Sequence, residues 1–573
     1  METGRSRNLM RKRKSAFSFL ALAVAMALAA SACGSSKKGA SGSTTSVAGK
    51  AGGKLVLAAE QWPDCINPIT QCANSSWLQW LVPIHVLPRL AELDEKNNFI
   101  ASPLVTELPS LTNGGIKQNP FTVTWHLNPA AKWNDGTPIT SADVDFTWQA
   151  YLKSKGSLST TGYADIASID TSDPKTVVLK FKHVYADWAD VFGGFSGVVL
   201  EKAKFTAPDT GSTMQKSIDF SGGPWILQSF SKNQLVLMPN KNYWDKSRVP
   251  LLDQVTFVPR TETNTEVQSV KSGEVAAAYP QPQTANVPQF RAAANVKTTF
   301  GVTTQYENLW FNQKAGHPFD DPNVRAAFMY SFDRTKFLND IVKPFDPVVK
   351  PLNCAAWVPG VGNWCKDDQF ADITYDPAKA AAAMQKSGYA KDSKGIWAKN
   401  GKELSIKWTV TTGNQRRADT QAEFIPLLKK EGFLVAPDNS DPDTVFQQRL
   451  PAGDYDMVML IEATSPDPSV TSYMACDQIP GPSNNGQGQN EWWWCNQAAT
   501  KVIHQSDQEL DVAKRTDLIH QVGQYARDDY VTYPLYVFPA MVVWRTDKVA
   551  GPIDQFVNSP ESVFWNLWDW SLK

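Results

Sequence analysis

Short strand-like runs alternate with capped helices along residues 54–573, and this alternation limits the chain to a few fold classes. Helix starts are marked by N-capping residues at Thr140, Asp321 and Asp376, and Gly388 predicts the end of the third helix. The runs with the apolar or alternating pattern of strands are Lys54–Ala59, Thr122–Leu127, Thr176–Phe181, Gln234–Met238, Ser405–Thr411 and Asp456–Ile461. We therefore predict an α/β or α+β fold in more than one lobe.

Residues 1–32 predict a signal peptide rather than part of the fold. A basic stretch precedes the apolar run Ala16–Ala30, which is too short to span a bilayer comfortably. The next residues, Ala30-Ser31-Ala32-Cys33-Gly34, resemble a bacterial lipobox, although Ala30 stands where Leu or Val is usual. We expect Cys33 to be lipidated, with residues 33–53 as a flexible tether. The protein would then lie on the outer face of the plasma membrane or in the periplasm; plain secretion with an unmodified Cys33 is the alternative.

The cysteines predict local disulfide bonds. Seven Cys are present, and the six that remain after Cys33 form an even set for an oxidising compartment. They fall in the close pairs Cys65/Cys72, Cys354/Cys365 and Cys476/Cys495. A metal site is the rival interpretation, but no C-x2-C occurs and no His lies near these pairs.

No catalytic pattern stands out. The six His show no H-E-x-x-H spacing, and there is neither a Walker A loop nor a GxGxxG. Carboxylates are plentiful, but no cluster indicates a glycosidase pair. The net charge of -1, from 56 Lys+Arg and 57 Asp+Glu, argues against a nucleic-acid partner. We expect a protein that is not an enzyme and that has no cofactor and no metal.

A family resemblance begins at residue 133. The stretch 133–146, WNDGTPITSADVDF, resembles the W-x-DG-x-P-x-T-A-x-DV-x-F segment of bacterial extracellular solute-binding proteins of family 5, the peptide/nickel-type receptors of ATP-binding-cassette (ABC) importers. Further matches follow in the family's order: GGPW at 222–225, NKNYW at 240–244, SGEV at 272–275, LWFN at 309–312, PFDDPNVRAA at 318–327, YDPAKA at 375–380 and YPLY at 533–536. With LWFN and PFDDPNVRAA taken as one motif, seven motifs in order make the resemblance specific, and it covers nearly the whole chain after the tether.

The resemblance implies a fold like that of type II periplasmic binding proteins, with two main lobes around a ligand cleft and an additional inserted lobe. Lobe I would use residues 54–98, 218–305 and 541–573, lobe II would be the insertion 99–217, and lobe III would be 306–540. The ligand would be enclosed by hinge closure. Implied partners are a small-molecule or peptide ligand, ABC permease subunits and the membrane through the lipid anchor, with the protein itself a monomer.

Aromatic and polar residues near the expected cleft are candidate ligand contacts, because such sites combine apolar walls with a few polar groups. For each aromatic ring, a place in the core is the alternative. The candidates are Trp62, Tyr279, Trp310, Glu462, Thr464, Asp467, Trp492, Trp493 and Trp494.

One departure from the family bears on the ligand. Peptide-binding relatives carry W-x-x-D-x-x-[DE]-P, in which the Asp takes the peptide's α-ammonium group. Aligned on Asp467-Pro468, this chain has Thr464 in place of that Asp and Ile461 in place of the Trp. We expect a ligand without a free α-amino group, unless Glu462 or Asp467 substitutes for the missing carboxylate.

Two functions are consistent with these sequence features. The first is an extracytoplasmic lipoprotein that captures a peptide or similar-sized solute and delivers it to an ABC permease. The alternative is a binding lipoprotein without transport that acts in cell-wall glycolipid or glycan metabolism.

Overall fold

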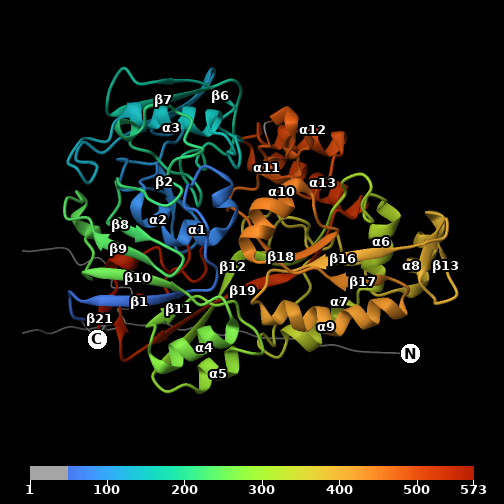
Figure 1. Cartoon of the computed structure of the whole chain (residues 1–573). Coiled ribbons are helices and arrows are strands. Elements are labelled where there is room, and N and C mark those ends of the chain that lie inside the picture. Colours follow the sequence, from blue (N-terminus) through green and yellow to red (C-terminus); the bar gives the residue numbers. More distant parts are fainter. Residues whose placement is uncertain (1–48, 485) are drawn as a thin grey trace, which may run out of the picture. The chain divides into compact units, whose positions relative to one another are not determined.

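A ten-stranded mixed sheet runs through the protein in the order β17-β16-β18-β12-β19-β11-β1-β10-β9-β8 (Figure 1). The computed structural model describes residues 49–484 and 486–573; the predicted signal peptide, Cys33 and most of the tether lie outside the described residues. The strands are β1 (Lys54–Ala59), β8 (Trp225–Phe230), β9 (Leu235–Pro239), β10 (Gln254–Pro259), β11 (Ala277–Ala278), β12 (Val296–Phe311), β16 (Ser405–Thr409), β17 (Leu434–Pro437), β18 (Met457–Ala463) and β19 (Thr532–Arg545).

The two longest strands, β12 and β19, connect the two halves of this sheet. They are antiparallel over most of their length, and their register shifts between Val302 and Tyr306. On one side of this shift β19 pairs with β11, and on the other side β12 pairs with β18. Figure 1 shows both strands in the middle of the sheet, with β1 and β10 on one side and β16 to β18 on the other. A local break in two continuous strands is the kind of position at which two lobes can hinge.

A separate four-stranded antiparallel sheet lies within residues 99–217, the predicted lobe II. Its strands, in spatial order, are β4 (Ile116–Gln118), β5 (Phe121–His126), β7 (Thr176–Phe181) and β6 (Ile166–Asp170). Helix α3 (Ser141–Lys153) has the capping box expected from Thr140 and Asp143.

The helix predictions from capping residues are confirmed. The side chains of Asp321 and Asp376 accept hydrogen bonds from the first turns of their helices, and Gly388 follows with φ of 79°. All six strand-like runs form strands. The main helices beyond α3 are α1 (Ser76–Leu81), α4 (Thr263–Ser272), α6 (Pro322–Ser331), α8 (Pro377–Lys386), α9 (Gln415–Lys430), α12 (Gln497–Ser506) and α13 (Val512–Asp528).

Most of the 21 Trp contribute to two large apolar cores. One core contains Trp125, Trp133 and Trp225, and the other contains Trp408 and Trp492. The described residues form one compact unit, so the three lobe ranges stay a prediction. No helix among the described residues is long and apolar enough to cross a membrane.

All three predicted disulfide bonds are present: Cys65–Cys72, Cys354–Cys365 and Cys476–Cys495. The first and third hold segments that line the cavity described next.

Candidate functional site

A cavity of about 330 Å³ lies at the carboxyl end of β18. Its lining comes mainly from three parts of the chain that are far apart in sequence, residues 68–79, 151–197 and 446–491, with Trp310 and Pro560 in addition. These ranges belong to the predicted lobes I, II and III. A site of this volume at strand ends, lined by several segments, has the usual location and size of a small-ligand site in a protein with parallel strands.

A second compartment of about 100 Å³ adjoins the first. The two share the lining residues Asn74, Ser76, Phe446, Ile461 and Ala463. The rest of the second compartment lies where β1 and β11 end, and combines rings and one carboxylate: Trp77, Trp80, Tyr279, Phe538 and Glu60.

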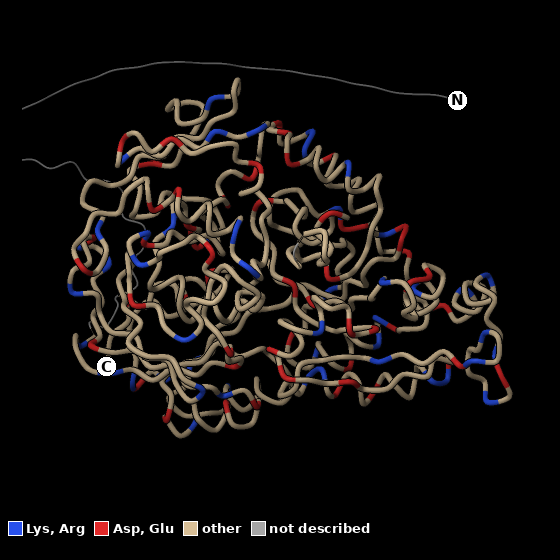
Figure 2. Tube along the Cα trace, turned by 45° about the horizontal axis from the view of Figure 1, so that its top comes forward, with Lys and Arg blue, Asp and Glu red and all other residues tan. Residues whose placement is uncertain are grey.

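Charge is distributed unevenly between the surface and the larger cavity. Figure 2 shows Lys/Arg and Asp/Glu interspersed along the chain trace. The lining of the larger cavity instead contains four carboxylates, Asp187, Asp190, Glu462 and Glu491, and none of its described lining residues is Lys, Arg or His. The lining is therefore rich in acidic groups and lacks basic ones, in a protein whose total charge is near neutral.

One of the four carboxylates has a cationic partner. Arg515 on α13 donates two hydrogen bonds to Asp467, at 3.0 and 2.8 Å, and also pairs with Asp187. Asp187 lies in the predicted lobe II, whereas Arg515 and Asp467 lie in the predicted lobe III. The guanidinium group therefore joins these two parts beside the cavity.

The other three carboxylates form no ion pair within the described part of the chain. Burial raises the pKa of Glu462 to about 8, and no described group donates a hydrogen bond to it. Burial also raises the pKa of Glu491 well above its ordinary value, despite a hydrogen bond from Asn74 Nδ2 at 3.0 Å, and the nearby Glu462 adds to the rise. Burial raises the pKa of Asp190 to about 6, against a hydrogen bond from Ser465 Oγ at 2.8 Å.

These carboxylates are too dispersed to bind one metal ion together. In the described ranges, only Cys354, Cys365 and Asp367 bring three potential ligand atoms within 4.8 Å of one another, and both of these cysteines are in a disulfide bond. A single Ca²⁺ or Mg²⁺ needs its oxygen ligands about 2–2.6 Å from the ion, hence closer together.

Four of the candidate contacts predicted from the sequence line the two compartments. Trp310, Glu462 and Thr464 line the larger one, and Tyr279 lines the smaller one. The Thr464 hydroxyl donates to the Thr304 carbonyl at 3.1 Å, so its proton is already used.

Trp62 and Asp467 line neither compartment. Trp62 stacks on Phe230 and donates through Nε1 to the Ser231 carbonyl at 2.9 Å. Asp467 is bound by Arg515, so it does not substitute for the carboxylate missing at Thr464.

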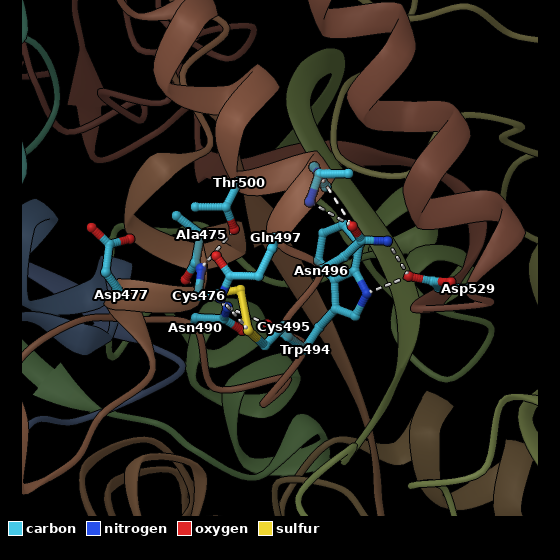
Figure 3. The surroundings of a disulfide bond; sticks show 12 residues. Ala475, Cys476, Asp477, Asn490, Trp494, Cys495, Asn496, Gln497, Thr500 and Asp529 are labelled. Atoms are coloured by element: carbon cyan, nitrogen blue, oxygen red, sulfur yellow. Dashed lines mark hydrogen bonds between the residues drawn. A yellow bond between two sulfur atoms is a disulfide. The ribbon is translucent and has the colours of Figure 1, made fainter.

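The three consecutive Trp residues also lie outside the cavity lining. Trp492 is buried and packs edge-to-face on Trp310, while Trp493 lies under the Lys314 ammonium group. Figure 3 shows the Trp494 indole pointing to Asp529, to which it donates at 2.8 Å, beside the Cys476–Cys495 disulfide. Packing by these rings fixes the segment that presents Glu491 to the cavity.

Five residues that line the cavity were not predicted from the sequence: Asn74, Gln79, Asp190, Tyr473 and Glu491. Glu491 had a usable signal, because it lies within the predicted Cys476–Cys495 loop and next to the Trp triplet. Asp190 had no such sequence signal, because only the folded chain brings it to Ser465, which is 275 residues away.

The comparisons with known proteins agree on one family. The family model described as "Bacterial extracellular solute-binding proteins, family 5 Middle" matches residues 103–480, well over half of the chain. A putative ABC transporter peptide-binding protein of Brucella ovis is 24% identical over 429 residues, covering 73% of this chain and 75% of that protein. The oligopeptide-binding protein OppA of Bacillus subtilis is 22% identical over 445 residues, covering 73% and 77%.

Solved structures show the same fold. The oligopeptide-binding protein AppA of Bacillus subtilis, in complex with a nonapeptide, superposes with a TM-score of 0.80 at 19% identity, covering 92% of this chain and all of AppA. NikZ from Campylobacter jejuni, in complex with Ni(L-His), gives a TM-score of 0.76 at 16% identity, covering 90% and 99%. The fold is that of the type II periplasmic binding proteins, and the chain belongs to the bacterial extracellular solute-binding proteins of family 5.

Proposed function

We propose that this protein is the solute receptor of an ABC importer, captures a peptide or similar-sized solute in the cavity at the end of β18, and delivers it to a permease. The observation that carries the proposal is the cavity itself, which is lined by all three predicted lobes. A site divided in this way couples ligand binding to closure, because the ligand contacts both sides of the hinge only when they approach.

Family relationships support the same function. The Brucella ovis relative is named as an ABC transporter peptide-binding protein, and OppA as an oligopeptide-binding protein. The family consists of binding proteins, not enzymes, and it is extracytoplasmic.

The test is the identity and fate of the bound solute. Protein purified without added ligand is denatured, and the solute that it releases is identified by mass spectrometry. Labelled solute is then supplied to cells with and without the gene. We expect import to fall in the deletion strain and to return with the restored gene.

Unchanged import in the deletion strain, together with tight binding of the released solute, would instead support the non-transport lipoprotein. Neither the family match nor the named relatives favour that alternative.

Lipidation of Cys33 is the second part of the proposal. The Cys33→Ala variant should leave the membrane fraction and lose incorporation of labelled fatty acid, because it lacks the modified thiol. Cys65 offers no substitute, since it is paired with Cys72. Unchanged membrane retention of Cys33→Ala would contradict the anchor without affecting the solute-binding proposal.

A further inference from the structure

The larger cavity contains an excess of acidic groups that no cationic residue of its described lining compensates. Asp190, Glu462 and Glu491 line it without an ion pair in the described part of the chain, and no described lining residue is cationic. Arg515, which lies behind the wall, is already bound to Asp187 and Asp467. An ionised carboxylate in a buried site costs several kcal/mol unless a partner compensates for it. The missing partner is therefore expected to arrive with the ligand.

An unpartnered acceptor in the same lining independently indicates a hydrogen-bond donor. Gln79 is 2% exposed, lines the cavity, and its Oε1 has no hydrogen-bond partner in the described structure. A buried carbonyl oxygen without a donor loses its hydrogen bonds to water and gains none in return. A ligand N–H group would satisfy it.

The lining also indicates what the ligand lacks. A zwitterionic peptide or amino acid brings a carboxylate that needs a cation or several N–H donors. None of the described residues lining the larger cavity is Lys, Arg or His, and a ligand carboxylate would face Asp190, Glu462 and Glu491. Like charges close together in a site of low dielectric repel strongly.

An inorganic cation does not fit the arrangement either, since the three carboxylates are not grouped at metal-ligand distances. They come from different segments: Glu462 from the end of β18, Glu491 from the segment closed by Cys476–Cys495, and Asp190 from the loop after β7. The volume of about 330 Å³, with the adjoining compartment of about 100 Å³, suits an organic molecule with separated charges.

From this arrangement we infer that the solute is an organic polycation without a carboxylate, a diamine or polyamine, with one amino group held by Glu462 and Glu491 and another by Asp190. This inference rests on the proposed solute-receptor function and names the class of its ligand. It takes up the alternative left open for a ligand without a free α-amino group: Glu462, two residues from Thr464, would supply the carboxylate that Thr464 lacks. The aromatic walls of the smaller compartment, Trp77, Trp80 and Tyr279, would pack against the methylene chain or a further ammonium group.

A series of compounds of matched length tests the inference. Binding of 1,7-diaminoheptane, heptylamine and 7-aminoheptanoic acid to the purified chain is measured by calorimetry and by thermal shift, with spermidine as a longer polyamine. We expect the diamine and spermidine to bind at least tenfold more tightly than heptylamine. The amino acid should be weaker still, by a further tenfold.

Neutral variants of the same shape locate the contacts. Glu462→Gln, Glu491→Gln and Asp190→Asn should each weaken diamine binding at least tenfold while leaving the weak heptylamine binding less affected. The matched control is Glu107→Gln, which neutralises an exposed carboxylate outside both compartments. Circular dichroism and unfolding temperature confirm that each variant folds.

Two results would overturn the inference. In the first, 7-aminoheptanoic acid or trialanine binds as tightly as the diamine, which would leave the receptor function intact and refute the amine class. In the second, the diamine binds no more tightly than heptylamine or is unaffected by Glu462→Gln. The receptor function is tested separately, by solute import in the deletion strain. Diamine binding and solute import are independent measurements, so the proposed ligand class and the proposed receptor function can fail separately.

Discussion

Two glutamates on neighbouring strands, Glu307 and Glu462, have opposite electrostatic environments. Glu307 on β12 pairs in register with Ile461 on β18, and the next pair in the ladder is Tyr306 with Glu462. Because successive side chains of a strand point to opposite faces, the two carboxylates lie on opposite faces of one sheet. Glu307 accepts hydrogen bonds from both Arg416 and Arg417 at the start of α9, whereas Glu462 faces the cavity.

This difference distinguishes a carboxylate with a structural role, Glu307, from one with a proposed role in binding, Glu462. Glu307, Arg416 and Arg417 are each at most 2% exposed, and the ion pairs compensate for their burial. Glu462 is partly buried against the cavity, and no cationic group of the described structure compensates for it. An uncompensated carboxylate is tolerated where solvent or a ligand reaches it, and this supports the proposed binding face of the sheet.

Breaking the compensated cluster should have the largest effect. Glu307→Gln leaves two buried guanidinium groups without their carboxylate, and we expect a loss of about 3–5 kcal/mol in the free energy of unfolding. Urea denaturation measures it. The control is Glu403→Gln, which removes the surface pair with Lys394 and should cost less than about 1 kcal/mol. Equal small effects of the two variants would show that the Glu307 cluster contributes no more than a surface pair.

An intermediate effect is expected at Arg515, whose carboxylate partners belong to different predicted lobes. Arg515→Gln removes the cation that joins Asp187 to Asp467, both of which are slightly more accessible than Glu307. We expect a loss of about 2 kcal/mol and a larger radius of gyration without ligand, because the like-charged groups then repel across the cleft. Small-angle X-ray scattering measures the opening.

An unchanged radius for Arg515→Gln would show that the two parts are held together by other contacts. The hydrogen bond from Ser465 to Asp190 is one such contact, and Ser465→Ala is the matched control for it.

Local sequence signals predicted the fold well because they report local physics. Asp321 and Asp376 were recognisable as caps since a cap acts within its own first turn, and the close spacing of the cysteines identified the three disulfide pairs. The charge state of the site was not predictable in this way. Whether Asp467 is available to a ligand depends on Arg515, 48 residues later, and Asp190 reaches the site only through tertiary packing.

The smallest effect on stability is expected for Glu462→Gln, and its size depends on pH. Burial raises the pKa of Glu462 from 4.5 to about 8, so between these values the folded protein holds a proton that the unfolded chain has released. Below pH 4.5 both states are protonated and the residue contributes no pH dependence. As the pH rises toward 8, ionisation of this residue lowers the free energy of the unfolded chain. The free energy of unfolding of the folded protein therefore falls.

The amide introduced by Glu462→Gln cannot ionise, so the variant avoids this loss. The groups that face Glu462 are Tyr306 from β12, Tyr473 from α11 (Thr471–Met474) and Glu491, none of which supplies a positive charge. Because the carboxylate is only partly buried and lines the cavity, we expect Glu462→Gln to be more stable than the wild type by about 1–2 kcal/mol at pH 8 and close to it at pH 5. Thermal unfolding at the two pH values measures the difference, and exposed Glu107→Gln should show none.

A ligand ammonium group would hold Glu462 ionised, so 1,7-diaminoheptane should stabilise the wild type more at pH 8 than at pH 5. The same stabilisation of Glu462→Gln at both pH values would show that Glu462 is not the group that titrates.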